Sequence, residues 1–159
     1  WHARGSFLVV PGTMAASLCL AFSMGEFGAT FLVVYCDGAS RSNPGEASIG
    51  VSITESQLEI ATISKKIGVA SNNVAEYLAL IEGLKYCVNS KVQTVCFYLD
   101  SKLVVEQIIG NFKVKSENLK EHYNEAINLI SEIDNFTIEH VYREDNKRAD
   151  QLANQALDE

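Results

Sequence analysis

Residues 31–45, FLVVYCDGASRSNPG, decide the fold. The run from Phe31 to Tyr35 consists of β-formers without polar alternation, which predicts a strand buried on both faces. We expect Asp37 to end this strand, at the rim of the core. A second apolar run, residues 95–99, is likewise followed by an aspartate, Asp100. Two neighbouring strands that end in aspartate would place two carboxylates side by side, which is unfavourable unless a cation lies between them.

Composition indicates one globular domain with a substantial core, because the chain has 159 residues of which 47% are hydrophobic. The net charge of −7, from 20 acidic and 13 basic residues, argues against a generic basic nucleic-acid patch. It does not argue against a site where metal ions bridge carboxylates to phosphates. The cysteines lack a metal-binding spacing, so we expect buried free thiols and a cytoplasmic protein; they are Cys19, Cys36, Cys87 and Cys96.

Residues 1–30 differ from the rest, since residues 5–25 carry no charge. A secretory signal or membrane anchor is one reading, but Pro11 and Gly12 interrupt the apolar run and no clean cleavage site follows. We therefore interpret residues 1–30 as a non-native or disordered leader, with Met24 as the natural start, and expect no membrane partner. The domain is predicted to cover residues 31–159.

The remaining segments predict an α/β domain with one mixed sheet and the order βββαβααβα. Three β-rich runs, residues 31–36, 48–54 and 57–67, are expected to form an antiparallel meander with a tight turn at residues 55–56. Helical periodicity and capping residues predict four helices, at residues 74–88, 102–109, 116–133 and 147–157. Two further strands are predicted at residues 95–99 and 136–142.

Four acids stand at the predicted element ends: Asp37, Glu76, Asp100 and Asp150. Asp37 and Asp100 would end strands, Glu76 would lie in the first turn of a helix, and Asp150 would begin the last helix. Each alone is explained more simply as a turn residue or a partner of the helix dipole. Together they form an oxygen-only ligand set that suits Mg²⁺ or Mn²⁺, and two such ions can hydrolyse a phosphodiester.

The four segments that carry these acids resemble the type 1 ribonuclease H family: DGASRSNPG, SNNVAEYLALIEGL, FYLDSKLVVEQIIG and HVYREDNKRADQLANQAL. The resemblance covers residues 31–157. It implies a five-stranded RNase H-like sheet whose first three strands are antiparallel. It also implies endonucleolytic cleavage of the RNA strand of RNA–DNA hybrids by a two-metal mechanism that leaves 5′-phosphate and 3′-hydroxyl ends. The implied metal ligands and catalytic residues are Asp37, Glu76, Asp100 and Asp150.

The resemblance also implies substrate contacts at Gly38, Asn43, Ser71, Asn72 and Asn73. Asn43 matches an asparagine that reaches into the minor groove, and Ser71 stands where the family often has a threonine that binds a DNA-strand phosphate. Amides near the helix start can meet base edges and 2′-hydroxyls, which distinguish RNA from DNA. The asparagines can equally serve as helix caps and turn residues. We expect a monomer, and double-stranded RNA stays open as a second substrate.

The sequence departs from the family pattern in two places that concern binding. Val74 replaces the usual arginine after the asparagine pair, and the connector at residues 110–116 is too short for the basic protrusion of many bacterial members. The chain is thus closer to the archaeal-like subgroup. Its substitutes for phosphate contacts are lysines that could also be ordinary surface residues: Lys65, Lys66, Lys113 and Lys115.

The histidine of the family's flexible loop has no clean counterpart. Arg143 occupies the loop before the last helix, and His140 lies within the last predicted strand. An arginine cannot act as a general base at neutral pH, but it can stabilise charge on the scissile phosphate. We therefore assign Arg143 an electrostatic catalytic role and His140 a structural one.

Two other functions stay open at this point. A 3′–5′ exonuclease of the same fold usually carries Asp-x-Glu on the first strand, whereas this chain has Asp37-Gly38-Ala39. A catalytically inactive module that only binds nucleic acid or protein would have lost an acid, whereas all four are present.

Overall fold

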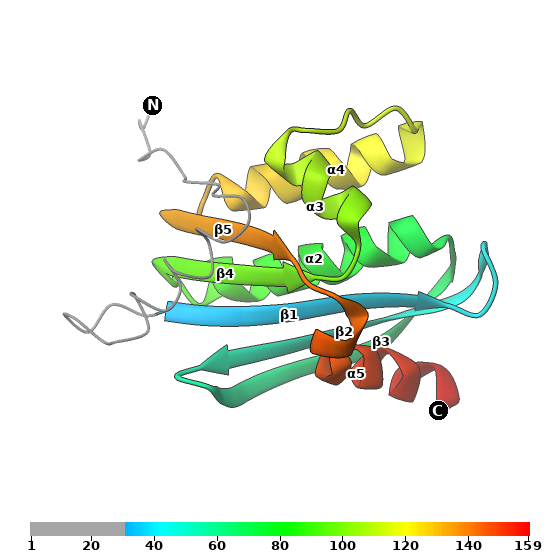
Figure 1. Cartoon of the computed structure of the whole chain (residues 1–159), viewed down its shortest axis with the longest axis horizontal. Coiled ribbons are helices and arrows are strands. Elements are labelled where there is room, and N and C mark those ends of the chain that lie inside the picture. Colours follow the sequence, from blue (N-terminus) through cyan, green and yellow to red (C-terminus); the bar gives the residue numbers. More distant parts are fainter. Residues whose placement is uncertain (1–30) are drawn as a thin grey trace.

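A computed structural model describes residues 31–159, which form a five-stranded sheet with helices on both faces (Figure 1). The predicted order βββαβααβα is confirmed, with a short 3₁₀ helix, η2, added before the last α-helix. In chain order, the elements are β1 (Phe31–Ser40), β2 (Gly45–Glu55), β3 (Leu58–Ala70), α2 (Asn72–Asn89), β4 (Thr94–Leu99), α3 (Lys102–Ile109), α4 (Glu117–Ile130), β5 (Asn135–His140), η2 (Arg143–Asp145) and α5 (Lys147–Asp158).

The sheet is mixed and has the order β3-β2-β1-β4-β5. Strands β1, β2 and β3 pair antiparallel, as the predicted meander requires. β4 runs parallel to both β1 and β5. The central position of β1 explains its apolar sequence. The parallel pairing with β4 brings the carboxyl ends of these two strands to the same end of the sheet.

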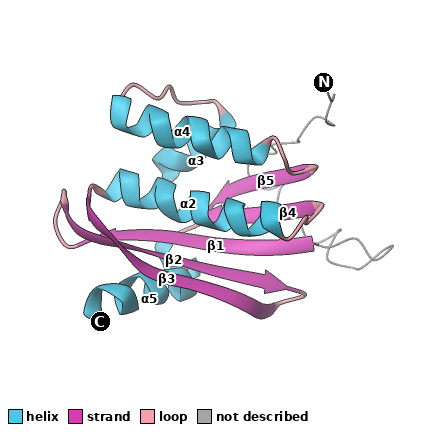
Figure 2. Cartoon of the chain, turned by 180° about the vertical axis from the view of Figure 1, so that it is seen from behind, coloured by secondary structure: helices cyan, strands magenta, loops and turns pink. Residues whose placement is uncertain are grey.

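Helices α2, α3 and α4 cover one face of the sheet, and α5 covers part of the other (Figure 2). The main core lies under α2, whose buried residues Tyr77, Leu80 and Leu84 belong to one hydrophobic cluster with Val34 and Phe97 of the sheet. α5 packs mainly on β2 and leaves the same face of β1 and β4 less covered. Tyr35 and Tyr98 stack there, with ring centroids 5.3 Å apart.

The first strand departs from the prediction in two ways. β1 does not stop at Asp37: it continues to Ser40, because residues 38–40 pair with residues 47–49 of β2. Asp37 therefore lies within the strand, opposite Gly50. The prediction that the strand is buried on both faces was wrong for Val33 and Tyr35, which are half-buried because α5 does not cover them.

The helix boundaries also correct two predictions. Ser71 is the N-cap of α2 and accepts a hydrogen bond from the Val74 backbone N–H at 3.3 Å. α2 thus begins at Asn72, and Glu76 lies beyond its first turn, where the helix dipole has little effect. α4 ends at Ile130 rather than at residue 133.

Cys36 and Cys87 are buried free thiols, as predicted, and burial raises the pKa of Cys87 to about 12. The same prediction was wrong for Cys96, which is disulfide-bonded. The leader, with Cys19 and Met24, lies outside the described residues, so the domain boundary at residue 31 stays a prediction. Among the described helices, none is both long and apolar enough to cross a membrane.

Candidate metal centre and nucleic-acid site

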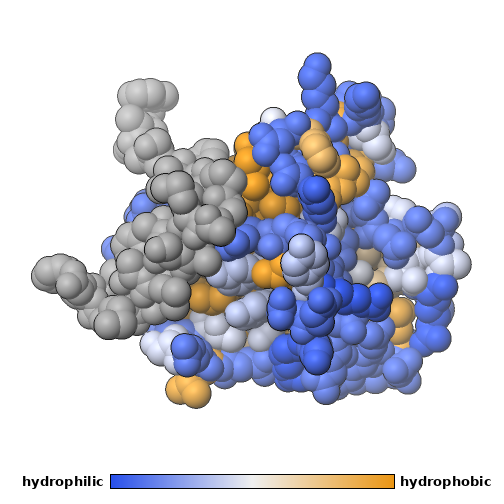
Figure 3. Space-filling model, viewed as in Figure 1, coloured by the Kyte–Doolittle hydropathy of each residue, from blue (hydrophilic) through white to orange (hydrophobic). Residues whose placement is uncertain are grey.

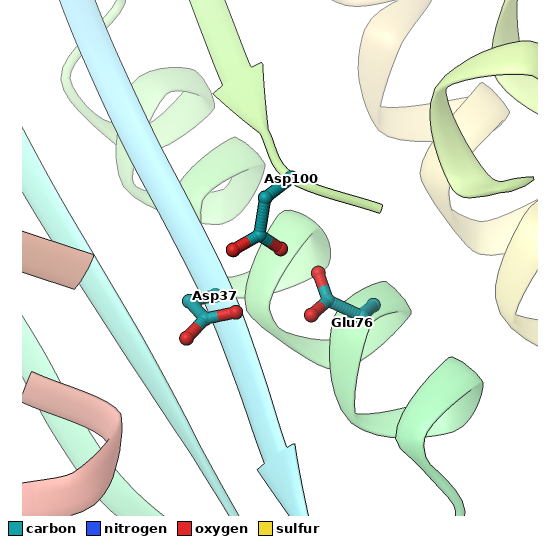
Figure 4. Close-up of side chains that lie close together, drawn as sticks. All are labelled: Asp37, Glu76 and Asp100. Atoms are coloured by element: carbon teal, nitrogen blue, oxygen red, sulfur yellow. The ribbon is translucent and has the colours of Figure 1, made fainter. Parts of the chain in front are cut away.

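Three predicted acids converge in the middle of the sheet, next to the carboxyl end of β4. Asp37 comes from β1, Glu76 from α2, and Asp100 directly follows β4. One carboxylate oxygen from each lies within 4.8 Å of the others, and Figure 4 shows the three side chains pointing toward one another. Three convergent oxygen ligands are the kind of site that a hard divalent cation prefers.

A glycine makes the approach of α2 to β1 possible. A Cβ atom at Gly38 would lie 2.3 Å from the main-chain carbon of Ala75 and 2.5 Å from the backbone nitrogen of Glu76. The Gly38 N–H also donates a hydrogen bond to Glu76 Oε1 at 3.1 Å. Gly38 therefore fixes the position of Glu76, while its predicted contact with substrate stays a prediction.

The fourth acid, Asp150, lies in the first turn of α5 and does not belong to the group of three. All four acids nevertheless line one cavity of about 540 Å³. α5 reaches this position because Gly50 of β2 has no side chain: a Cβ there would lie 2.1 Å from the Ala149 carbonyl oxygen. Thus two close helix–strand approaches, one on each face of the sheet, bring the acids to one cavity.

The carboxylates are held in conditions that disfavour their charged forms. Asp37 is 5% exposed and Glu76 is 7% exposed. Burial, followed by the charges of Glu76 and Asp100, raises the pKa of Asp37 to about 10. Burial and the charge of Asp100 raise the pKa of Glu76 to about 8, and burial also raises the pKa of Asp100.

Glu76 Oε2 is buried without a hydrogen-bond partner. Such an oxygen is costly to bury unless a partner satisfies it. Together with the oxygen-only donor set and the crowded negative charge, it indicates that the residues present fit a divalent cation.

The raised pKa values predict how the stability of the metal-free protein depends on pH. Between the unfolded pKa of about 4 and the folded pKa values of about 8 for Glu76 and about 10 for Asp37, the folded state holds protons that the unfolded state has released. Stability must then fall as pH rises through this interval. We expect the melting temperature in EDTA to drop from pH 5 to pH 8, and the drop to shrink in saturating Mg²⁺. An equal drop in melting temperature in EDTA and in Mg²⁺ would contradict the assignment of these acids as ligands of a divalent cation.

Asn146 is a site residue that the sequence reasoning missed. Its side chain is 1% exposed and donates a hydrogen bond through Nδ2 to the Cys36 carbonyl oxygen at 2.8 Å. A hydrogen bond from Asn146 also acts to lower the pKa of Asp100, against the larger effect of burial. Asn146 thus ties the start of α5 to β1 beside the acids. In the sequence it reads only as a loop residue before a helix.

Arg143 and His140 have different surroundings. The Arg143 side chain is 79% exposed and lines the cavity, with Nη2 3.7 Å from Asp150 Oδ1. His140 ends β5, and its Nε2 donates to the Asp100 carbonyl oxygen at 3.2 Å. The His140 ring also contacts Tyr142 edge-on. The His140 contacts are thus within the protein, whereas Arg143 faces the cavity; both roles stay predictions.

The predicted substrate-binding residues gather around the start of α2. Asn43 Oδ1 accepts a hydrogen bond from the Asn72 backbone N–H at 3.0 Å, which ties the β1–β2 turn to this helix. Asn72 lines the cavity, Asn73 is exposed, and Ser71 caps the helix. The Asn43 side chain thus has a structural contact, and the substrate contacts of all three asparagines stay predictions.

The four lysines proposed as phosphate contacts differ in their surroundings. Lys65 pairs with Glu82 at 3.2 Å, and Lys66 donates to the main-chain oxygen of Glu159 at 2.6 Å. Both are therefore engaged within the protein. Lys113 and Lys115 are exposed on the connector between α3 and α4, where they remain candidates.

Comparison with known proteins agrees with this geometry. Residues 35–156 match the family described as "Reverse transcriptase-like". The bifunctional protein Rv2228c of Mycobacterium tuberculosis is 41% identical over 80% of this chain and 35% of its own length. Ribonuclease HI of Halobacterium salinarum is 39% identical over 79% of this chain and 63% of its own length. The chain thus spans only part of these relatives, about a third of the first.

A solved structure of LC11-RNase H1 in complex with an RNA/DNA hybrid has a TM-score of 0.76 to this chain. It is 40% identical, and the match covers 80% of this chain and 96% of that one. Residues 35–156, which the family model matches, contain all four acids. The chain therefore belongs to the type 1 ribonuclease H family.

Proposed function

We propose that this chain is a metal-dependent endoribonuclease that hydrolyses the RNA strand of RNA–DNA hybrids and leaves 5′-phosphate and 3′-hydroxyl ends. The observation that carries the proposal is the convergence of Asp37, Glu76 and Asp100 within 4.8 Å, in a cavity that Asp150 also lines. The hybrid bound to LC11-RNase H1 supports the choice of substrate. We further propose that the protein acts as a monomer.

The proposed cofactors are two Mg²⁺ or Mn²⁺ ions, held by Asp37, Glu76, Asp100 and Asp150. When bound, such ions supply an activated water and stabilise the leaving oxygen of a phosphodiester. The chain's own contribution is to hold the carboxylates in place before substrate arrives. Gly38 orients Glu76 through the hydrogen bond to Oε1, and this preorganisation removes the need to rearrange the site during the reaction.

Recognition of the hybrid is assigned to the turn and helix start beside the cavity. The hydrogen bond between Asn43 Oδ1 and the Asn72 backbone leaves the Asn43 amide nitrogen as the group that can donate to the minor groove. Asn72 is exposed and lines the cavity, and Asn73, the next residue of α2, is also exposed. Glu76 is a further candidate to accept a hydrogen bond from the 2′-hydroxyl next to the cut.

The proposal is tested with end-labelled duplexes incubated with Mg²⁺ or Mn²⁺: an RNA–DNA hybrid, double-stranded RNA and double-stranded DNA. We expect internal cuts in the RNA strand of the hybrid and none in DNA. Cleavage that proceeds only from the 3′ end would favour an exonuclease, and binding without cleavage would favour an inactive module. Either result would overturn the proposal. The double-stranded RNA arm decides whether that duplex is also a substrate.

Arg143→Ala is expected to lower kcat by about tenfold to a hundredfold, with a smaller change in hybrid affinity. The reason is that Arg143 offers an exposed guanidinium at the cavity, beside Asp150, where charge develops on the scissile phosphate. Steady-state kinetics on a labelled hybrid separates kcat from KM, and Arg143→Lys serves as the charge-preserving control. A rise in KM with an unchanged kcat would reject the electrostatic role.

A further inference from the structure

A second arginine, Arg41, faces the cavity in addition to Arg143. Arg41 lies in the turn after β1 and lines the same cavity as the four acids. Among the described residues that line this cavity, the basic ones are Arg41 and Arg143, against five acids when Asp158 is counted. A nucleic acid carries a negative charge at every phosphate, so each cation at this opening matters for binding.

Arg41 is held by the C-terminal end of α5. Its Nη2 donates to the Leu157 carbonyl oxygen at 2.7 Å and lies 3.1 Å from Asp158 Oδ1. Its Nε lies 3.8 Å from Glu46 Oε2. The guanidinium thus sits at the negative end of the helix dipole, with two carboxylates beside it.

These contacts are of a kind that a phosphate can replace. The side chains of Arg41 and Asp158 are 51% and 75% exposed, and Figure 3 shows a largely hydrophilic surface over α5. Exposed ion pairs contribute little to stability, because water and salt screen them. Asp158 contacts the guanidinium through Nη2, whereas a phosphate of the duplex can bind a guanidinium through two oxygens at once and so can replace this carboxylate.

We propose that Arg41 binds a backbone phosphate of the hybrid, and that Asp158 competes with the substrate for it. The end of α5 then sets the affinity of the site, because the pair with Asp158 must open before the phosphate binds. This inference rests on the proposed function, since it concerns the substrate of that same site.

A purely structural role for Arg41, as a cap on α5, predicts different results. The bond to the Leu157 carbonyl already satisfies one end of the helix, and it would stabilise α5 whether or not a substrate binds. In that case, removal of the Asp158 charge would change hybrid affinity only by lowering the overall electrostatic repulsion between the protein and the phosphates. Removal of a neighbouring charge of the same sign would then have the same effect.

The test compares Asp158→Asn with Glu159→Gln, which removes the same charge one residue along the chain. Cleavage of the labelled hybrid is followed in Mg²⁺ at several salt concentrations. We expect Asp158→Asn to lower KM about threefold to fivefold with kcat unchanged, and to steepen the dependence of log KM on log salt. Glu159→Gln should change KM by less than about twofold. Equal effects of the two variants would overturn the proposal.

Arg41→Gln and Asp158→Asn together form a double-mutant cycle, which tests whether the two side chains act on the same phosphate contact. We expect KM to rise about threefold to tenfold and the salt slope to fall by about 0.9, the value for one lost phosphate contact. Asp158→Asn should no longer lower KM in the Arg41→Gln background, because the competed group is gone. Arg41→Lys should recover part of the affinity, and thermal melts of each variant separate binding from unfolding of α5.

A full gain from Asp158→Asn in the Arg41→Gln background would contradict the proposal. This failure is distinguishable from failure of the proposed function. If the unmodified protein cuts no hybrid, the function is wrong; if it cuts the hybrid but Asp158→Asn matches Glu159→Gln, only the role of Arg41 is wrong.

Discussion

Asp37→Asn is expected to reduce hybrid cleavage by at least about a thousandfold, because it removes a charged ligand of the proposed metal ions and with it their electrostatic stabilisation of the transition state. Asp37 is buried beside Glu76 and Asp100, and its oxygen belongs to the group within 4.8 Å. An amide keeps the size of the side chain but removes a charged ligand. Initial rates on a labelled hybrid, in Mg²⁺ and in Mn²⁺, give the measurement.

The same substitution should make the metal-free protein more stable. In the folded state, burial and the charges of Glu76 and Asp100 raise the pKa of Asp37 to about 10, so ionisation at this position opposes folding. Because asparagine cannot ionise, we expect a higher melting temperature in EDTA, by about 5 °C or more. The gain should be larger at pH 8 than at pH 5, since the opposing effect grows with pH.

Asp134→Asn is the matched control, because it removes the same charge from an exposed position outside the cavity. It should leave both turnover and the melting temperature near those of the unmodified protein. If Asp37→Asn retained turnover, the metal assignment would be wrong. If it lost turnover but melted at a lower temperature, the residue would be structural and the account of its environment would fail.

The order of strands and helices along the chain and the candidate acids could be predicted from sequence, because they depend on local patterns. Apolar runs, capping serines such as Ser71 and Ser101, and the terminal Gly110 each mark an element within a few residues. The end of β1 could not be predicted in the same way. Ser40 continues the strand because Ala47 lies opposite it, and pairing across a turn decides where a strand stops.

The residues that sequence reasoning missed make contacts across more than a hundred positions of the chain. Asn146 bonds to Cys36, and Arg41 bonds to Leu157 and Asp158. No local sequence spacing relates these partners. In the sequence, Asn146 and Arg41 therefore look like ordinary polar loop residues. Gly38 was named as a substrate contact, yet what the structure shows is a steric need set by α2, a helix that begins 34 residues later in the chain.

Gly38→Ala is the second substitution with a large expected effect. The added Cβ would lie 2.3 Å from the Ala75 main-chain carbon and 2.6 Å from the Ala75 carbonyl oxygen. Neither atom belongs to a flexible side chain, so relief requires β1 and α2 to move apart. We expect a loss of about 2–4 kcal/mol of stability, as for overpacking of a tight core, and a melting temperature lower by roughly 10 °C.

The displacement should also reduce cleavage by about a hundredfold or more, since a misplacement of about 1 Å can have that effect. Glu76 would lose both its place near Asp37 and its hydrogen bond from the Gly38 N–H. Circular dichroism melts measure the loss of stability. Initial rates at a temperature where the variant stays folded measure the loss of cleavage separately.

Gly68→Ala is the control, because a Cβ there meets no atom within 4 Å although the residue has a φ of +84°. It should lower stability by only about 1 kcal/mol, from backbone strain alone, and leave turnover unchanged. If Gly38→Ala and Gly68→Ala had the same melting temperature and both cleaved normally, α2 would not pack tightly enough against β1 at Gly38 to exclude a side chain. The convergence of Glu76 with Asp37 and Asp100 would then need another cause than the missing side chain.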